Sequence, residues 1–438
     1  MLGINENLDS LQAENKTINV AIAGIGQMGS SIISHLNSLK AFKVLAIANR
    51  NVQKSYGTVK SLGYSDNDIY VFEKNSKNNG CSEDEISKAI QSGKTIFTDS
   101  LTAISQIKEA DVIVDATGNP EAGAQIAFTG ISNKKHIVTL NVETDTAIGP
   151  ILKRLALNSG VVYTVAAGDE PAAMKELYDF ATVLNLEIIA AGKGKNNPLN
   201  INANPATVKE YSDQKGASPK MMASFVDGTK TMVEMACFSN ATGIIPDCRG
   251  MHGPHVNVED LTKVFSLKKD GGILDKKGVI DFAIGNVAPG VFIVYSTDND
   301  MLRKELKYLL SGDGPNYLLY RPFHLASIEL PLSIASAYFY NKPTIAPRNG
   351  LISEVITMAK IDLKKGEVID GMGGYSVYGS IELYQKSKDL QLLPIGLSEG
   401  AELKKDVRKG EPLRYEDVHI KDDSKIYNLR KLQEMIIG

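Results

Sequence analysis

Residues 17–36 read TINVAIAGIGQMGSSIISHL, and this stretch decides the fold of the first part of the chain. Ile18 to Ala23 is an apolar, partly β-branched run, which is typical of a buried parallel strand. The glycines that follow are spaced G-x-G-x-x-G, and SSIISHL then has helical spacing. Strand, glycine turn and helix in this order predict a βαβ unit that binds a dinucleotide, with the pyrophosphate at the helix N-terminus.

The glycine turn supplies the first candidate ligand residues. We expect the cofactor to contact the turn and the first helical residues, which are Gly24, Gly26, Gln27, Met28 and Gly29. A tight strand-to-helix turn without a ligand is the structural alternative.

The next strand, FKVLAIA, indicates which dinucleotide binds. An NAD site usually presents an acid about 20 residues past the glycines to hold the ribose 2′-hydroxyl. Here the strand ends with Asn49 and Arg50 instead. A neutral side chain followed by a guanidinium suits a 2′-phosphate, which favours NADP over NAD. Alternatively, Arg50 belongs to a solvated loop.

Two further strands end in polar residues. They are ADVIVDATGN and HIVTLNVETD, and ligands of an open α/β sheet bind beyond the carboxyl ends of its strands. We therefore expect Thr117, Gly118 and Asn141 near the nicotinamide ribose and ring. Residues 51–95 look like a long surface insertion with a short helix of its own.

Composition restricts the function classes. The 438 residues are 43% apolar and carry a formal net charge of -3, which gives no global attraction to nucleic acid or anionic membranes. Three cysteines do not suggest a disulfide framework, and the polar N-terminus lacks the apolar core of a signal peptide. We expect a cytoplasmic enzyme without a membrane span.

The stretch AAGKGKNNPLN at residues 190–200 places two lysines two positions apart at the end of an apolar strand. Side chains alternate along a strand, so Lys193 and Lys195 project to one side, where two ammonium groups repel unless an anion lies between them. A phosphate or an enolate would serve, and the residues do not tell which lysine meets which group. Solvated loop lysines are the alternative.

A carboxylate pair begins the helix EPAAMKELYDF. Glu170 follows Asp169 at the predicted helix start, where an acid can be a general base or hold a divalent cation. Acids at this position are also common as simple caps of the helix.

Two arginines are candidate phosphate ligands, because a guanidinium matches phosphate oxygens with two donors. Arg249 lies in the glycine-punctuated stretch DCRGMHGPH. Arg321 precedes a largely apolar helix, which we expect to pack against the nucleotide domain. Cys248, His252 and His255 match no common zinc spacing.

Residues 360–420 contain a small internal repeat. DLKKGE at 362–367 is echoed by DVRKGE at 406–411, among short strands broken by glycines. The pattern predicts a compact β module, which serves as a lid, a dimerisation surface or a stabilising appendage.

Several motifs resemble known families. VAIAGIGQMG, DATGNPEAGA and HIVTLNVETD resemble homoserine-dehydrogenase-like oxidoreductases, although Val142 stands where homoserine dehydrogenase carries a lysine. The resemblance is closer to the reductoisomerase-like (DRL) family, through AAGDEPAAMKELYDFA, GKGKNNPLN, RGMHGPH, YRPFHL, GGYSVYGSIE and LPIGLSEGAELKKDVRKGEPL. The C-terminal module resembles the SAF domain of sialic acid synthases and antifreeze proteins.

The resemblance implies an α/β fold and an activity. It implies an NADP-binding Rossmann domain at 1–150, an α+β substrate and dimerisation domain at 151–345, and a SAF-like domain at 346–438. The expected enzyme is an NADPH-dependent reductoisomerase that converts 1-deoxy-D-xylulose 5-phosphate to 2-C-methyl-D-erythritol 4-phosphate for isoprenoid synthesis.

The catalytic candidates are Glu170, Lys193, Lys195, Arg249 and Arg321. We expect a homodimer and a sugar phosphate substrate. Chemical analogy adds Mg²⁺ or Mn²⁺, with unknown ligands. The alternatives are a dehydrogenase of another small polyol phosphate or semialdehyde, and a non-catalytic sensor that binds NADP or a sugar.

Overall fold

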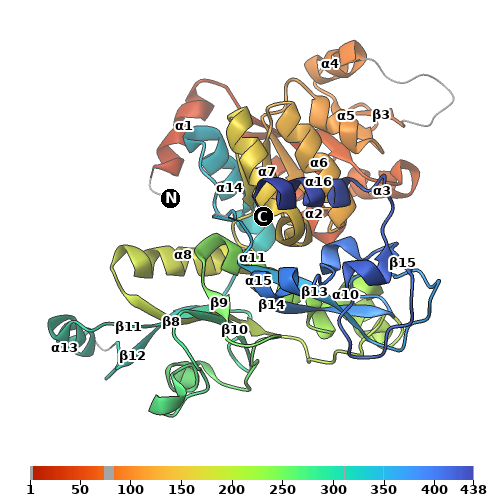
Figure 1. The fold of residues 1–438 in the computed structure, drawn as a ribbon. Coiled ribbons are helices and arrows are strands. Elements are labelled where there is room, and N and C mark those ends of the chain that lie inside the picture. The colour runs from red at the N-terminus through yellow and green to blue at the C-terminus, as the bar shows by residue number, and fades with distance from the viewer. Residues whose placement is uncertain (1–2, 74–82, 310, 349, 438) are drawn as a thin grey trace. The chain divides into compact units, whose positions relative to one another are not determined.

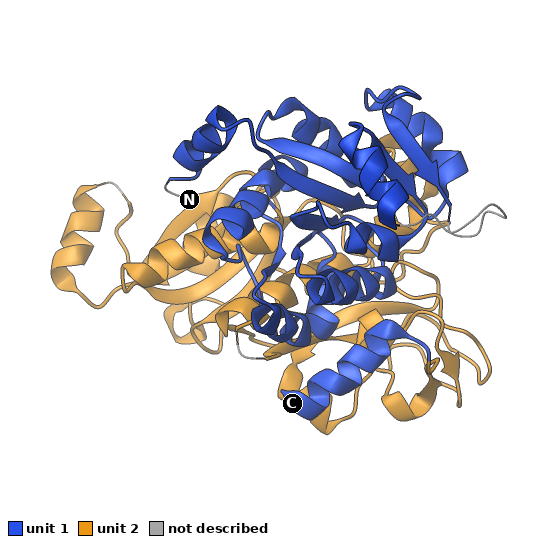
Figure 2. Cartoon of the chain, turned by 90° about the horizontal axis from the view of Figure 1, so that it is seen from above, with its two compact units in different colours: residues 1–168, 325–346, 423–438 blue, residues 169–324, 347–422 orange. Residues whose placement is uncertain are grey.

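The computed structural model describes residues 3–73, 83–309, 311–348 and 350–437. The chain forms two compact units, each built from separate segments (Figure 2). Unit 1 comprises residues 1–168, 325–346 and 423–438, and unit 2 comprises residues 169–324 and 347–422. No helix in the described part of the chain is both long and apolar enough to cross a lipid bilayer.

Unit 1 is built on a seven-stranded parallel sheet with the order β3-β4-β2-β1-β5-β6-β7. Figure 1 labels the helices of this unit. The strands are β1 (Ile18–Ala23), β2 (Phe42–Ala48), β3 (Ile69–Phe72), β4 (Thr95–Thr98), β5 (Val112–Asp115), β6 (His136–Thr139) and β7 (Tyr163–Val165). The strand order reverses between β1 and β5, and ligands of such sheets bind at this switch point. The predicted α/β fold with a Rossmann-type first domain is confirmed.

Several helices of unit 1 pack in two groups, one around α14 (Ala326–Tyr340) and the other around α16 (Lys425–Ile436). The other helices of this unit are α1 (Ile4–Ala13), α2 (Gln27–Ser38), α3 (Val52–Ser61), α4 (Glu83–Gln91), α5 (Leu101–Gln106), α6 (Pro120–Ser132) and α7 (Val142–Ser159). Helix α14 packs against α1, α2 and β6, as the sequence predicted, and α16 packs against α6 and α7. The apolar sides of α2 and α14 share one buried core with β1 and β2.

Residues 51–95 were expected to be a surface insertion with a short helix. The short helix is present as α4, but the expectation of an insertion is wrong for β3, which belongs to the sheet. Strands β3 and β4 belong to the parallel sheet, and all four residues of β4 are buried. Four residues are too few to show a clear periodic pattern in the sequence. Residues 74–82 of this stretch lie outside the described residues.

The two compact units do not follow the linear division expected at residues 150 and 345. Position 150 falls inside α7, whose N-terminal two thirds are buried. Residues 423–438 were expected in the C-terminal domain, but they belong to unit 1 because Ile426 and Leu429 of α16 are buried there. Burial of apolar surface, which is the main stabilising term in folding, therefore overrides chain order.

Unit 2 contains a five-stranded sheet with the order β12-β11-β8-β10-β9. The strands are β8 (Glu187–Lys195), β9 (Ile245–Pro246), β10 (Val279–Ile284), β11 (Val291–Ser296) and β12 (Asn316–Arg321). The central strand β8 runs parallel to β10 and antiparallel to β11. The helices are α8 (Glu170–Val183), α9 (Lys209–Lys215), α10 (Pro219–Val226), α11 (Thr229–Thr242), α12 (Leu261–Val264), α13 (Asp300–Tyr308) and α15 (Tyr384–Asp389).

The rest of unit 2 is a small β-rich module, as the repeat predicted. It contains β13 (Ser353–Ala359), β14 (Val377–Leu383), β15 (Glu402–Leu403) and β16 (Val418–His419). The two copies of the repeat bind each other reciprocally, through Leu363 and Val407 at N···O distances of 2.8 and 3.0 Å. The Asp406 carboxylate accepts from the Lys365 amide at 2.9 Å, and Asp362 accepts from Lys409 at 2.8 Å. The two copies of the repeat are thus hydrogen-bonded to each other. The identity of the module as a SAF domain stays a prediction.

Candidate functional site

The glycine turn of unit 1 has the geometry that a dinucleotide requires. Gly24 has φ +94, and a Cβ there would lie 2.6 Å from the Ala116 carbonyl oxygen. A Cβ on Gly29 would lie 2.0 Å from the Gly24 carbonyl oxygen, so helix and strand pack too closely for any side chain. Gly26 faces open space, with no atom within 4 Å of a Cβ there. The chain therefore leaves room for a pyrophosphate at the position where the motif expects it.

The remaining turn residues are accessible. Gln27 and Met28 are exposed on the first turn of α2, and Arg50 is exposed after β2. The Asn49 side chain donates to the Ser55 hydroxyl, and its amide donates to the Thr98 carbonyl at 2.9 Å. None of the ion pairs found among the described residues involves Arg50.

Asn141 differs from the expectation that it meets the nicotinamide. The side chain is fully buried, and its amide group donates to the Asp115 carboxylate at 3.1 Å and to the Asn119 carbonyl at 2.8 Å. Its carbonyl oxygen caps α7 by accepting from the Thr144 amide at 3.2 Å. Both donors and the acceptor are used within the protein, so Asn141 holds the loops after β5 and β6 together.

Thr117 and Gly118 follow β5 and are half-buried. Thr117 binds back to the Asp115 carboxylate through its hydroxyl at 2.7 Å and its amide at 2.9 Å. Gly118 has φ +60, a conformation that favours glycine. These contacts fix the loop at the carboxyl end of β5, beside the glycine turn after β1.

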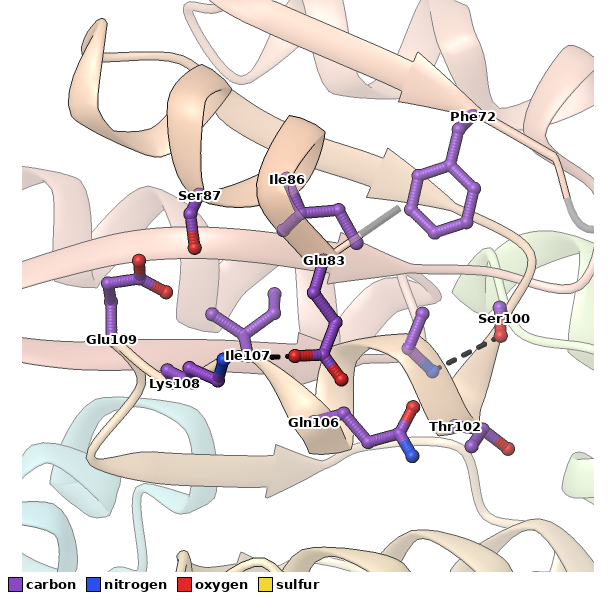
Figure 3. Close-up of a pocket in the computed structure, with 11 residues that line it drawn as sticks. Phe72, Glu83, Ile86, Ser87, Ser100, Thr102, Gln106, Ile107, Lys108 and Glu109 are labelled. Atoms are coloured by element: carbon purple, nitrogen blue, oxygen red, sulfur yellow. Dashed lines mark hydrogen bonds and ion pairs between the residues drawn. The ribbon is translucent and has the colours of Figure 1, made fainter. Parts of the chain in front are cut away.

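Unit 1 also contains a cavity of about 240 Å³ between α4 and α5 (Figure 3). The Glu83 and Lys108 side chains form an ion pair at 3.0 Å beside it, and Phe72 lies against it. None of the residues expected to bind the cofactor lines this cavity. It is also smaller than the 300–1,000 Å³ typical of ligand pockets, so it does not compete with the glycine turn as a cofactor site.

In unit 2, the two lysines of β8 lie on one side of the strand, as their spacing predicts. Both are about 95% buried, with 5% of the residue surface exposed. The glycines that alternate with them, Gly192 and Gly194, face the other side, where a Cβ on Gly192 would lie 2.5 Å from the Phe292 ring. A Cβ on Gly194 would lie 2.1 Å from the Ala288 nitrogen. The G-K-G-K pattern therefore reflects one tightly packed face and one charged face.

Lys193 is neutralised by carboxylates of the protein itself. Its Nζ lies 2.8 Å from Glu170 Oε1 and also contacts Glu234 Oε2. Glu170 begins α8, with Asp169 as the N-cap, and Glu234 lies in the middle of α11. The sequence predicted an anion between the two lysines. For Lys193, the protein itself supplies this negative charge through the Glu170 and Glu234 carboxylates.

Glu234 was not anticipated from the sequence. It is 1% exposed, in a helix that is buried at every position from Thr231 to Thr242. The sequence does contain a signal for this residue, since Glu234 lies in the largely apolar run TMVEMACF. A carboxylate buried in such a run requires a charged or hydrogen-bonding partner, which marks it as a candidate site residue.

His324 adds a second partner to the Glu170 carboxylate, with Nε2 at 3.3 Å from Oε1. The sequence placed His324 near Arg321 without a role. Arg321 itself binds Glu176 of α8 at 3.0 Å, and its guanidinium lies 4.7 Å from the centre of the Phe323 ring. No contact between Arg321 and the Glu170 carboxylate occurs within the described residues.

Arg249 is also held by a carboxylate. Its Nε donates to Glu382 Oε2 of β14 at 2.7 Å. The two terminal nitrogens make no hydrogen bond to the described part of the chain, so they can still receive an anion. The structure thus joins Glu170 and Lys193 directly, and it places Arg249 and Arg321 in separate ion pairs.

The charges shift the pKa values in opposite directions. Burial would lower the pKa of Lys193, but Glu170 and Glu234 outweigh it and raise this pKa. Burial would raise the pKa of Glu170, but Lys193 and His324 hold it below its usual range. Burial and the neighbouring glutamates raise the pKa of Asp169 well above its usual range. Within the cluster, Asp169 therefore holds a proton more readily than Glu170 does.

Lys195 is a second buried lysine of β8, and the described residues do not use all of its donors. Its Nζ donates to the Phe225 carbonyl at 2.6 Å, and this is its one hydrogen bond to the described residues. Burial and the charge of Lys193 lower its pKa from 10.5 to about 8. An ammonium has three donors, so two can face a ligand.

His252, in the loop after β9, lies between two aspartates. His252 Nδ1 lies 2.8 Å from Asp281 Oδ2, and Nε2 lies 3.5 Å from Asp247 Oδ2. The pKa of His252 is raised, chiefly by its hydrogen bond to Asp281. Among the described residues, the set that could hold a metal ion is Asp169, Glu170 and Glu234, and Cys248 and His252 are not in it.

Two family models match consecutive parts of the chain. Residues 24–166 match the NAD binding domain of homoserine dehydrogenase, and residues 168–330 match the catalytic domain of oxidoreductase DRL. Neither match extends beyond residue 330, and none of the curated proteins matches. These matches identify an NAD(P)-dependent oxidoreductase that resembles the DRL type.

Three solved structures are similar to parts of this chain. A 1-deoxy-D-xylulose 5-phosphate reductoisomerase from Zymomonas mobilis in complex with NADPH is 17% identical, with a TM-score of 0.35, and the match covers 50% of this chain and 57% of that one. A DOX-P reductoisomerase in complex with magnesium is 13% identical, with a TM-score of 0.40 and coverage of 74% and 70%. A probable dehydrogenase from Thermotoga maritima is 12% identical, with a TM-score of 0.37 and coverage of 63% and 72%. Identities this low do not identify a substrate.

Proposed function

We propose that this oxidoreductase is an NADPH-dependent reductoisomerase that converts 1-deoxy-D-xylulose 5-phosphate to 2-C-methyl-D-erythritol 4-phosphate. The observation that carries the proposal is Lys195, a buried ammonium with a pKa of about 8 and donors to spare. A ketose phosphate needs such a group, because its oxygens gain negative charge while its carbon skeleton rearranges. The match to the DRL catalytic domain over residues 168–330 agrees with this assignment.

The reaction makes distinct demands on the chain. One hydroxyl loses a proton, one carbon–carbon bond breaks as another forms, and the former keto oxygen takes up a proton. The resulting aldehyde then takes up a hydride and a further proton. NADPH supplies the hydride when bound, and Gly24, Gly26 and Gly29 would hold its pyrophosphate. Arg50 would hold the 2′-phosphate, because its exposed guanidinium follows β2 where an NAD site has an acid.

Lys195 would donate hydrogen bonds to the substrate oxygens and supply the proton. A group with a pKa near the working pH is the most effective proton donor, and Lys195 meets this condition. Glu170 has a lowered pKa, which makes it a weak base, so its role would be to fix Lys193 and His324. Arg249 would anchor the phosphate through its terminal nitrogens. We also propose that the protein is a homodimer.

The divalent cation suggested by the reaction has one candidate position in the described chain, between Asp169, Glu170 and Glu234. Their ligand atoms lie within 4.8 Å of one another, which suits a cation. However, the Lys193 ammonium already contacts Glu170 and Glu234. A metal does not fit beside this charge, and no step of the proposed mechanism depends on one.

The test is NADPH oxidation by the purified protein with 1-deoxy-D-xylulose 5-phosphate, both with and without added Mn²⁺, with the product identified by mass and NMR. Formation of the branched methylerythritol phosphate supports the proposal. Consumption of NADPH with an unchanged carbon skeleton would indicate a dehydrogenase instead. NADPH binding without turnover of this substrate would contradict the proposal and favour another substrate or a sensor.

A matched pair of lysine variants tests the site. We expect Lys195→Ala to lose most of the activity while it still binds NADPH, because the cofactor turn belongs to unit 1. Lys209→Ala on α9 removes an exposed lysine and should leave activity unchanged. Equal activity of the two variants would remove Lys195 from the mechanism.

A further inference from the structure

The cluster around Glu170 resembles a metal site in which a lysine contacts two of the three carboxylates. Three carboxylates from two helices converge so that one oxygen of each lies within 4.8 Å of the others. Oxygen ligands in this number, supplemented by water or substrate, are what Mg²⁺ and Mn²⁺ prefer. In this chain, however, the group that two of these carboxylates contact is the Lys193 ammonium.

Lys193 is held at this position by the fold. It lies on β8, between the paired residues Phe282 of β10 and Val291 of β11. Its side chain is 6% exposed, and those of Glu170 and Glu234 are 15% and 2% exposed. A buried ammonium loses its hydration, so it is retained there by its two carboxylate partners.

A divalent cation would compete directly with this ammonium. It would need the carboxylate oxygens that Lys193 already contacts, and it would lie within a few ångströms of a like charge. Like charges at such a distance repel strongly where water is excluded. The ammonium cannot move away at low cost, because its stem comes from the middle strand of the sheet.

We infer that Lys193 is a built-in cation that replaces a divalent metal between Glu170 and Glu234, so that the chain excludes Mn²⁺ and Mg²⁺ from this cluster. The part of the inference that concerns turnover rests on the proposed function. Lys193 touches the carboxylates, so it is a positioning residue, while Lys195 two positions later is the group that meets the substrate. Its fixed positive charge also makes Lys195 more acidic.

The decisive experiment is a titration of the full chain with Mn²⁺, followed by the electron paramagnetic resonance signal of free Mn²⁺. After treatment with EDTA and its removal, the wild-type protein should bind no Mn²⁺ at this cluster. Lys193→Met removes the ammonium at similar volume and should acquire one Mn²⁺ per chain, at least about tenfold tighter than any wild-type binding. Lys193→Arg keeps the charge and should behave like the wild type.

The location of the ion is tested with Glu234→Gln. Combined with Lys193→Met, it should abolish the acquired Mn²⁺ binding, because a neutral amide is a poorer ligand than a carboxylate. One Mn²⁺ per wild-type chain that is lost in Glu234→Gln alone would overturn the inference. That wild-type titration decides the matter even if Lys193→Met does not fold.

Activity gives a separate readout. EDTA-treated wild-type protein should turn over 1-deoxy-D-xylulose 5-phosphate at the same rate with and without added Mn²⁺. Turnover that requires Mn²⁺ would overturn the inference and leave the proposed function standing. If the substrate is not turned over under any condition, the proposed function fails, while the Mn²⁺ titration still tests the built-in cation.

Discussion

Raising the pH through about 8 should inactivate the protein by deprotonating Lys195. Burial and the charge of Lys193 bring its pKa from 10.5 down to about 8. The shift corresponds to roughly 3 kcal/mol of destabilisation of the charged form. About nine tenths of the lysine is charged one pH unit below the pKa and about one tenth one unit above it. If Lys195 donates the proton, kcat/KM should therefore fall about tenfold per pH unit on the alkaline side.

The assay is the initial rate of NADPH oxidation with 1-deoxy-D-xylulose 5-phosphate, measured at low substrate concentration across the alkaline range. Lys195→Arg is the informative variant, because a guanidinium keeps its charge at every pH of the assay. It should have low activity and no decline near pH 8. A wild-type rate that stays level to about pH 9.5, or a decline that persists unchanged in Lys195→Arg, would refute this role of Lys195.

The same shift predicts an effect on stability. Between pH 8 and 10.5 the unfolded chain binds a proton at Lys195 that the folded chain does not, so this lysine makes the free energy of unfolding rise with pH there. Below pH 8, Lys195 is charged in both the folded and the unfolded chain, so the full cost of burying its charge lowers the free energy of unfolding. Lys195→Met should consequently raise the free energy of unfolding at neutral pH, by up to about 3 kcal/mol, while it abolishes activity. A destabilised Lys195→Met would contradict the lowered pKa.

Three further predictions concern the rest of the chain. Gly26→Ala should keep normal thermal stability but lose NADPH binding, because a Cβ there enters open space, whereas Gly29→Ala should lose both, since its Cβ would clash with the Gly24 carbonyl; calorimetric titration and melting curves separate the two. Arg50→Ala should weaken NADPH binding about 10- to 100-fold and leave NADH binding unchanged, and an equal loss for both cofactors would exclude a 2′-phosphate contact. Lys360→Met should cost about 3–5 kcal/mol in urea unfolding, because it leaves Asp227 buried without its partner at 2.7 Å. Lys364→Met, whose pair with Asp406 is exposed, should cost much less, and similar losses for the two variants would contradict the burial argument.

Local patterns were sufficient for the parts of the site that are contiguous in the chain. The glycine turn was predicted because strand, turn and helix all lie within residues 17–38, and their spacing has few other solutions. The helix start at Glu170 and Pro171 was predicted for the same reason. The orientation of Lys193 and Lys195 follows from the period of two in a strand.

Contacts between distant segments could not be predicted in this way. Asn141 was expected to meet the cofactor, but the fold brings Asp115 and Asn119 against its side chain and leaves it no donor for a ligand. Arg249 was expected as a phosphate clamp, and the fold gives it Glu382 as a partner 133 residues later. A polar side chain reveals its chemistry in the sequence, but its partner depends on which elements pack together.

The amino-acid sequence by itself determined the α/β class, the dinucleotide turn and the paired lysines, because these depend on side-chain periodicity and backbone sterics over a few residues. Tertiary structure alone decided that Glu234, 41 residues beyond Lys193, neutralises that lysine while Lys195 keeps donors for a ligand. The physical reason is desolvation. Burial makes an unpaired charge costly, so the roles of the two lysines are set by the carboxylates that folding brings within reach of each.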